Sequence, residues 1–130
     1  MHEHLADAIR HPALVRLSPN VCVARFEVLK VYSTLGAVEH LLRSGRVNAG
    51  TTLVDSSSGV YAAALALACH KYGLKCHVVA SASIDPSLKA QLEILGCTVD
   101  PVAPAENIKL DQSHRVARVK EILRSGRHVF

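Results

Sequence analysis

Aromatic residues are scarce in this chain. Only 4% of the 130 residues are Phe, Tyr or Trp, and Trp is absent, although 49% of the residues are hydrophobic. The core must therefore be built from Ala, Val and Leu, whose small side chains let helices and strands pack closely. The shortage of aromatics also leaves no platform on which nucleic-acid bases could stack.

Long apolar runs are missing as well. No stretch approaches the roughly 18 consecutive apolar residues that span a bilayer, and Met1-His2-Glu3-His4 lacks the basic-then-apolar pattern of a signal peptide. We therefore expect a cytoplasmic protein with no membrane partner. The length, with 20% charged residues, favours a single globular domain over residues 1–130. Residues 1–12 are expected to be flexible.

The cysteines form no C-x-x-C pair. They are scattered through stretches that read as strand or helix interiors: Cys22, Cys69, Cys76 and Cys97. Free cysteines in such places behave as small hydrophobic residues with raised pKa values and poor access. We predict reduced structural thiols, no disulfide framework and no metal site.

The net charge of +4 is concentrated near the end of the sequence. Between residues 114 and 128, basic side chains alternate with Val, Ile and Leu at helical spacing. This pattern predicts an amphipathic helix whose basic face, including Arg115 and Arg118, is solvated. No nucleic-acid partner is expected.

Strand and helix patterns alternate along the chain. Strands are predicted at 21–26, 51–55, 76–80 and 98–102, with a fifth beginning at 128–130; helices are predicted within 33–43, at 60–72, at 86–95 and over the basic segment ending at Gly126. Strands separated by helices of about ten residues or more pair in parallel. The predicted fold class is α/β, a single three-layer open sandwich with a mostly parallel sheet of four to five strands.

Ser56-Ser57-Ser58-Gly59 lies between the strand at 51–55 and the helix at 60–72. Ligands of open parallel sheets bind beyond the carboxyl ends of the strands. Hydroxyls, free backbone N–H groups and the positive end of the helix dipole would favour a carboxylate or a phosphate here. On spacing alone, the same residues could simply cap the helix.

Several segments together resemble a known family: Ala-Leu-Val-Arg-Leu at 13–17, the strand ending in Phe26-Glu27, Gly-Arg-Val-Asn-Ala-Gly-Thr-Thr-Leu-Val-Asp-Ser-Ser-Ser-Gly at 45–59, residues 64–66, and Pro-Ser-Leu-Lys through Leu-Gly-Cys-Thr-Val at 86–99. In this order they resemble the N-terminal part of fold-type-II pyridoxal-phosphate (PLP) enzymes, the cysteine synthase and tryptophan synthase β group. The triple serine is most similar to diaminopropionate-synthase-like members, which make β-substituted alanines from an activated serine. The resemblance implies PLP as cofactor, and Ser57, Ser58 and Gly59 as the loop that grips the substrate carboxylate.

The family also has a lysine that forms a Schiff base with the cofactor. Counting back from Gly59 without gaps places Lys30 at this position, which makes Lys30 the candidate catalytic and cofactor-binding residue. Counting forward from Glu27 instead places Gly36 there, and the chain then has no such lysine. Independently of the resemblance, Lys30 could be a solvated charge on a connecting loop.

The chain departs from the family in two further ways. Val60 stands where members usually have an Asn that contacts the cofactor ring hydroxyl, and Tyr61 is bulky where they are compact. Members are also more than twice as long, and their larger C-terminal domain supplies the Gly-rich phosphate cup. This leaves two interpretations: a lobe of a PLP-dependent amino-acid β-replacement enzyme that is not catalytically complete alone, or a degenerate, non-catalytic module that has lost the cofactor. Such a module would bind a small carboxylate at Ser56–Gly59 or pair with another protein.

The missing second domain also has a consequence for the surface. The face against which it would pack should be partly apolar, and large apolar patches mark association sites. We therefore expect a homo-oligomer or a protein partner.

Overall fold

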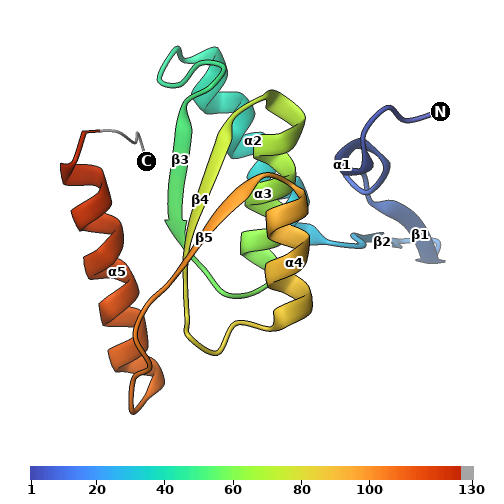
Figure 1. The fold of residues 1–130 in the computed structure, drawn as a ribbon. Coiled ribbons are helices and arrows are strands. Elements are labelled where there is room, and N and C mark those ends of the chain that lie inside the picture. Colours follow the sequence, from blue (N-terminus) through green and yellow to red (C-terminus); the bar gives the residue numbers. More distant parts are fainter. Residues whose placement is uncertain (127–130) are drawn as a thin grey trace.

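Three parallel strands form the centre of the fold (Figure 1). A computed structural model describes residues 1–126, and its central sheet contains β3 (Thr52–Ser56), β4 (Lys75–Ala80) and β5 (Cys97–Pro101), in that order. Their connections, α3 (Val60–Tyr72) and α4 (Pro86–Ile94), supply the crossovers that parallel neighbours require. All three strands therefore end at the same edge of the sheet.

Helices cover both faces of this sheet. On one side, α3 and α4 pack together with α2 (Leu29–Arg43), and α5 (Ile108–Arg124) covers the other side (Figure 1). The middle strand is buried on both faces, since Val78 and Val79 are each 0% exposed. Val78 joins the larger core beside α3, whereas Val79 packs with Val54 and Ile122 under α5. The predicted three-layer α/β architecture is confirmed.

The helix ends follow the local signals in the sequence. Asp85 caps α4 by accepting a hydrogen bond from the Leu88 N–H at 2.9 Å, and Pro86 occupies the first helical position. Gly73 ends α3 in the left-handed conformation with φ of 66°. Consequently α3 spans the predicted 60–72.

The predicted strand at 21–26 does not join the parallel sheet. It is β2 (Val21–Arg25), which pairs antiparallel with β1 (Ala13–Ser18) as a separate hairpin. The short Pro19-Asn20 connection can join only antiparallel neighbours. The parallel sheet of residues 1–126 thus has three strands rather than four to five, and the strand predicted at 128–130 lies outside the described residues.

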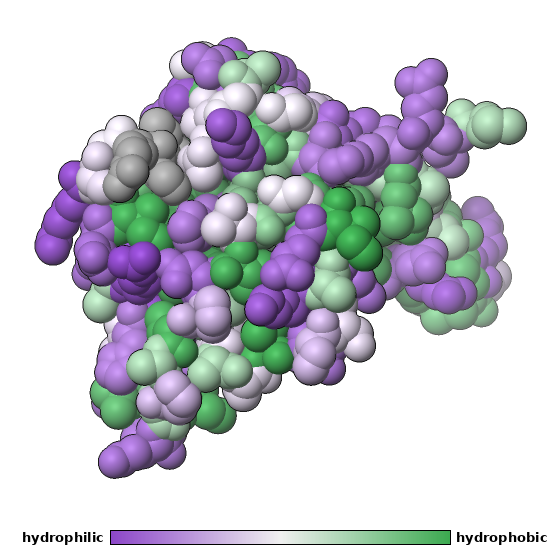
Figure 2. Space-filling view, viewed as in Figure 1, coloured by the Kyte–Doolittle hydropathy of each residue, from purple (hydrophilic) through white to green (hydrophobic). Residues whose placement is uncertain are grey.

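The hairpin is exposed on both of its faces. Every residue of β1 and β2 is exposed, including Leu14 at 78% and Leu17 at 66%. In Figure 2 it lies toward the right edge of the molecule. Cys22 is therefore accessible, contrary to the expectation for all four cysteines.

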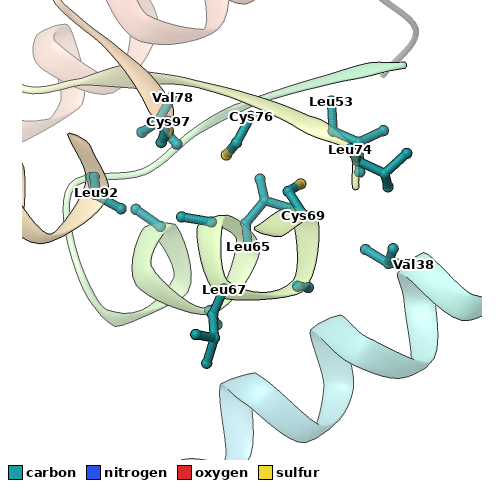
Figure 3. Close-up of a cluster of buried hydrophobic side chains, with 14 of the residues drawn as sticks. Val38, Leu53, Leu65, Leu67, Cys69, Leu74, Cys76, Val78, Leu92 and Cys97 are labelled. Atoms are coloured by element: carbon teal, nitrogen blue, oxygen red, sulfur yellow. The ribbon is translucent and has the colours of Figure 1, made fainter. Parts of the chain in front are cut away.

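The other three cysteines are buried and free. Figure 3 shows Cys69, Cys76 and Cys97 among the side chains between the sheet and α3. Contacts with the Cys69 and Cys97 thiols, together with burial, raise the pKa of Cys76. These thiols are packing residues of the core, as predicted.

The N-terminal segment contacts α2 and α3. It contains the short helix α1 (Leu5–Ala8), whose Ala6 is fully buried. Arg10 binds Glu39 of α2 at 2.9 Å, and Lys71 of α3 binds Asp7 at 2.5 Å. These two ion pairs join the start of the chain to the helical layer.

Over residues 1–126, no helix is both long and apolar enough to cross a bilayer.

Candidate functional site

The triple-serine loop, Ser56–Gly59, lies at the carboxyl edge of the sheet, where β3 is followed by α3. Ser56 ends β3 and Gly59 is the N-cap of α3. Within the described part of the chain, no side chain caps the N-terminus of this helix. Among the hydrogen bonds of residues 1–126, none is donated by the backbone N–H of Val60 or Tyr61. Two donors at the positive end of the helix dipole are thus available to an anion.

The three serines have different surroundings. The Ser57 N–H donates to the Val79 carbonyl at 3.1 Å, whereas its hydroxyl has no partner within the described part of the chain. The Ser58 hydroxyl accepts a hydrogen bond of 2.6 Å from the Ser81 N–H. Ser56 accepts a longer one, 3.5 Å, from Arg115. The middle serine is therefore the one whose hydroxyl is uncommitted.

Two α5 residues complete a network behind this loop. Ser81 donates through its hydroxyl to Asp111 at 2.9 Å, and Arg115 Nε donates to the same carboxylate at 2.8 Å. The Arg115 and Ser81 hydrogen bonds lower the pKa of Asp111. We call Ser56, Ser58, Ser81, Asp111 and Arg115 the α5 network.

The α5 network was not predicted from the sequence. Arg115 was predicted to lie on a solvated basic face, but its side chain is only 15% exposed and is paired with Asp111. The reason is that α5 packs against β3 and β4, which turns this residue toward the ends of those strands. The i, i+4 spacing of Asp111 and Arg115 was the only local signal of the pair.

Lys30 is the second residue of α2 rather than part of a loop. It is exposed, and its side chain makes no ion pair or hydrogen bond with residues 1–126. Gly36, the alternative position, lies further along the same helix and has no functional group. The first turn of α2 thus presents an unpaired primary amine.

A groove of about 510 Å³ connects this turn of α2 with the triple-serine loop. Its wall includes Val28 and Val31 on either side of Lys30 in the sequence, and Ser58, Gly59 and Val60 from the loop. The rest of the wall is largely apolar. Val60 is 60% exposed, and its side chain offers no hydrogen-bond donor.

The residues present fit part of a PLP site. A lysine amine can hold the cofactor covalently, and the free N–H groups of Val60 and Tyr61 suit an anionic group. Val60 cannot bind the ring hydroxyl. No cluster of His, Cys, Asp or Glu able to hold a metal ion occurs among residues 1–126.

A sequence profile described as "Pyridoxal-phosphate dependent enzyme" matches residues 26–130. No curated protein sequence matches the chain. The fold resembles O-acetylserine-dependent cystathionine β-synthase from Helicobacter pylori (TM-score 0.76, 19% identity), covering 96% of this chain and 44% of that protein.

Two further solved structures are similar. A hydrogen sulfide-producing enzyme from Fusobacterium nucleatum has a TM-score of 0.79 and 14% identity, covering 100% of this chain and 45% of that one. Cysteine synthase from Entamoeba histolytica has a TM-score of 0.78 and 15% identity, covering 97% and 41%. The chain thus spans less than half the length of these three proteins, and at these identities the likeness concerns the fold.

Proposed function

We propose a function for this chain, which belongs to the family of pyridoxal-phosphate-dependent enzymes. It forms the half of such an enzyme that binds the carboxylate of an amino-acid substrate. The same half carries the cofactor-binding lysine, Lys30. The reaction is β-replacement on an activated serine. The active site is completed by a further protein segment or chain that binds the phosphate group of the cofactor.

One observation carries this proposal. The turn of α2 that bears Lys30 and the triple-serine loop border the same groove, through Val28 and Val31 on one side and Ser58 and Gly59 on the other. An uncommitted amine and an anion-binding loop are the two groups that must be close together to act on the α-carbon of an amino acid.

Bound PLP acts as an electron sink for the bonds at the substrate α-carbon. The chain's own residues bind and orient. Lys30 Nζ provides the covalent attachment. The Ser57 hydroxyl and the N–H groups of Val60 and Tyr61 donate to the substrate carboxylate, which fixes the direction of the α-carbon relative to Lys30.

The reaction class is supported by the fold neighbours. The similar structures include a cysteine synthase, an O-acetylserine-dependent cystathionine β-synthase and an O-ureido-L-serine synthase. All three names refer to serine- or cysteine-like amino acids. A triple-serine loop at the carboxyl edge of the sheet gives this chain a suitable carboxylate site.

Val60 supports one alternative, a module that binds a carboxylate without using the cofactor. Its exposed isopropyl group borders the groove and cannot bind a ring hydroxyl. In that case the loop would still bind a small carboxylate, and Lys30 would have no special reactivity.

A visible absorbance titration with PLP tests the proposal. We expect a long-wavelength band in the wild-type protein, its loss in Lys30→Ala, and its retention in Lys75→Ala, a matched exposed lysine at the other edge of the sheet. An equal loss of intensity in both variants would contradict the role of Lys30. Carboxylate binding without any band would favour the non-catalytic module.

A further inference from the structure

We infer that Asp111 and Arg115 of α5 are positioning residues that hold the triple-serine loop in its ligand-binding shape. The inference rests on the proposed role of this loop in carboxylate binding. Neither residue lines the groove between the first turn of α2 and the loop, so both act through the serines.

The α5 network holds the loop on both sides of Ser57. Ser58 is fixed by the 2.6 Å hydrogen bond from the Ser81 N–H, and Ser56 is contacted by Arg115 at 3.5 Å. The Ser81 N–H holds the Ser58 oxygen in place, and the Ser58 O–H can still turn toward an acceptor. Ser57 lies between these two contacts, and the free N–H groups of Val60 and Tyr61 follow shortly after Ser58.

Asp111 connects these two contacts. One carboxylate oxygen accepts from the Ser81 hydroxyl at 2.9 Å and the other from Arg115 Nε at 2.8 Å. The Arg115 distance is typical of a charge-assisted N–H···O hydrogen bond, which is stronger than a neutral one, and the Ser81 hydroxyl donates to the same carboxylate over a longer distance. The side chains of Asp111 and Arg115 are each only 15% exposed, so solvent screens the pair weakly.

The network also joins parts of the chain that are far apart in sequence. Arg115 lies 59 residues beyond Ser56, and Asp111 lies 30 residues beyond Ser81. No side chain of residues 1–126 caps the N-terminus of α3, where the loop ends. The bond from the Ser57 N–H to Val79 holds the loop to β4, and the network adds a connection to α5. Removal of the Asp111 charge should therefore loosen the loop without altering the first turn of α2.

Amide hydrogen exchange of the purified protein tests this inference, with Asp111→Asn compared with wild type. We expect the protected amides of residues 56–62, such as the Ser57 N–H that donates to Val79, to exchange roughly 10-fold faster or more in the variant, the size expected for one lost hydrogen bond to a charged group. Peptides from the C-terminal half of α3 should not change. Glu121→Gln, an exposed α5 carboxylate outside the network, is the matched control.

A second readout separates positioning from general stability. Binding of L-serine, measured by calorimetry, should weaken by a similar factor in Asp111→Asn. The Lys30 share of borohydride-reduced PLP adduct should stay at its wild-type value, because α2 lies outside the network. Ser81→Ala keeps the N–H that binds Ser58 but removes the hydroxyl that binds Asp111. It should change amide exchange and L-serine binding in the same direction as Asp111→Asn. If Asp111→Asn does not fold, Ser81→Ala takes its place in both measurements.

The outcomes distinguish the positioning role of Asp111 and Arg115 from the proposed function of the chain. Unchanged exchange over residues 56–62 in a folded variant would overturn the positioning role. Faster exchange, in a protein whose wild type neither binds L-serine nor labels Lys30, would confirm the network and contradict the proposed function instead.

Discussion

At the scale of single residues, Ser57 differs from its neighbours. Its backbone is fixed by the hydrogen bond to Val79, while its hydroxyl has no partner within residues 1–126. Ser58 is already bonded to Ser81. A ligand at this loop would therefore find Ser57 ready to donate without breaking a bond in the protein.

We predict that Ser57→Ala weakens L-serine binding by roughly 10-fold or more, since a hydrogen bond to a charged group contributes about 1.5–3 kcal/mol. The unfolding free energy should be nearly unchanged because no protein contact is lost. Isothermal titration checks the affinity, and Ser87→Ala, an exposed serine of α4, is the control. Equal affinities in both variants would contradict a role for the Ser57 hydroxyl.

Glu39 is a second informative residue. It accepts from the Tyr72 hydroxyl at 2.5 Å and from Arg10 at 2.9 Å. These two hydrogen bonds, that of Tyr72 first, lower the pKa of Glu39 below its ordinary 4.5. Burial and the same carboxylate raise the pKa of Tyr72 to about 12. Glu39 thus connects the N-terminal segment to α2 and α3.

The Glu39 contribution should depend on pH. Because its pKa is lower in the folded chain, the carboxylate stabilises the fold above pH 4.5 and loses this contribution as the pH falls through the folded pKa. Glu39→Gln should cost about 1–2 kcal/mol at neutral pH, and the difference from wild type should shrink in acid. Urea denaturation at neutral and acidic pH measures it. Glu93→Gln, in an exposed pair, should show a much smaller difference.

At the scale of elements, one glycine ends a helix and another lies inside one. Gly73 adopts φ of 66° at the end of α3, where a side chain is strained. Gly36 lies within α2, is exposed, and has no atom within 4 Å of an added Cβ. Only the first position requires glycine.

We expect Gly73→Ala to destabilise the fold by about 1–2 kcal/mol, the cost of a left-handed alanine. Gly36→Ala should stabilise it by about 0.5–1 kcal/mol, because alanine favours a helix interior. Thermal and chemical denaturation of the two variants form a matched pair. A loss of stability in both would mean that α2 needs Gly36 for packing.

These examples also explain what the sequence could and could not predict. Asp85, Pro86 and Gly73 act within one turn, so the ends of α3 and α4 could be predicted from local patterns. The β1–β2 pairing was missed because no strand was predicted at 13–18, although the short Pro19-Asn20 connection is a local signal of a hairpin. Arg115 and Ser56 meet only after α5 packs on the sheet, so the α5 network had no signature beyond a helical Asp-to-Arg spacing.

At the scale of the whole molecule, the β1–β2 hairpin is the main uncovered surface. Its exposed apolar side chains include Leu14, Val15, Leu17 and Val23. A two-stranded hairpin is marginal in water on its own and is usually stabilised by packing on something else. We propose that the hairpin is an association surface, which a second copy of this chain covers in solution.

Sedimentation equilibrium at high micromolar concentration should therefore show a species larger than the monomer. The double variant Leu14→Lys with Leu17→Lys should shift it to monomer, since charge on exposed strands opposes pairing between chains. Ile94→Lys on α4, an isolated exposed residue, should have no such effect. A wild-type chain that stays monomeric would contradict association through the hairpin.

The central claim, that Lys30 and the triple-serine loop act in one PLP-dependent site, is tested most directly by peptide mapping. The protein is incubated with substoichiometric PLP, reduced with borohydride and digested, and the adduct on each lysine is quantified. The account predicts that Lys30 carries most of the adduct and Lys75, its exposed counterpart, very little. An adduct spread evenly over the exposed lysines would contradict it.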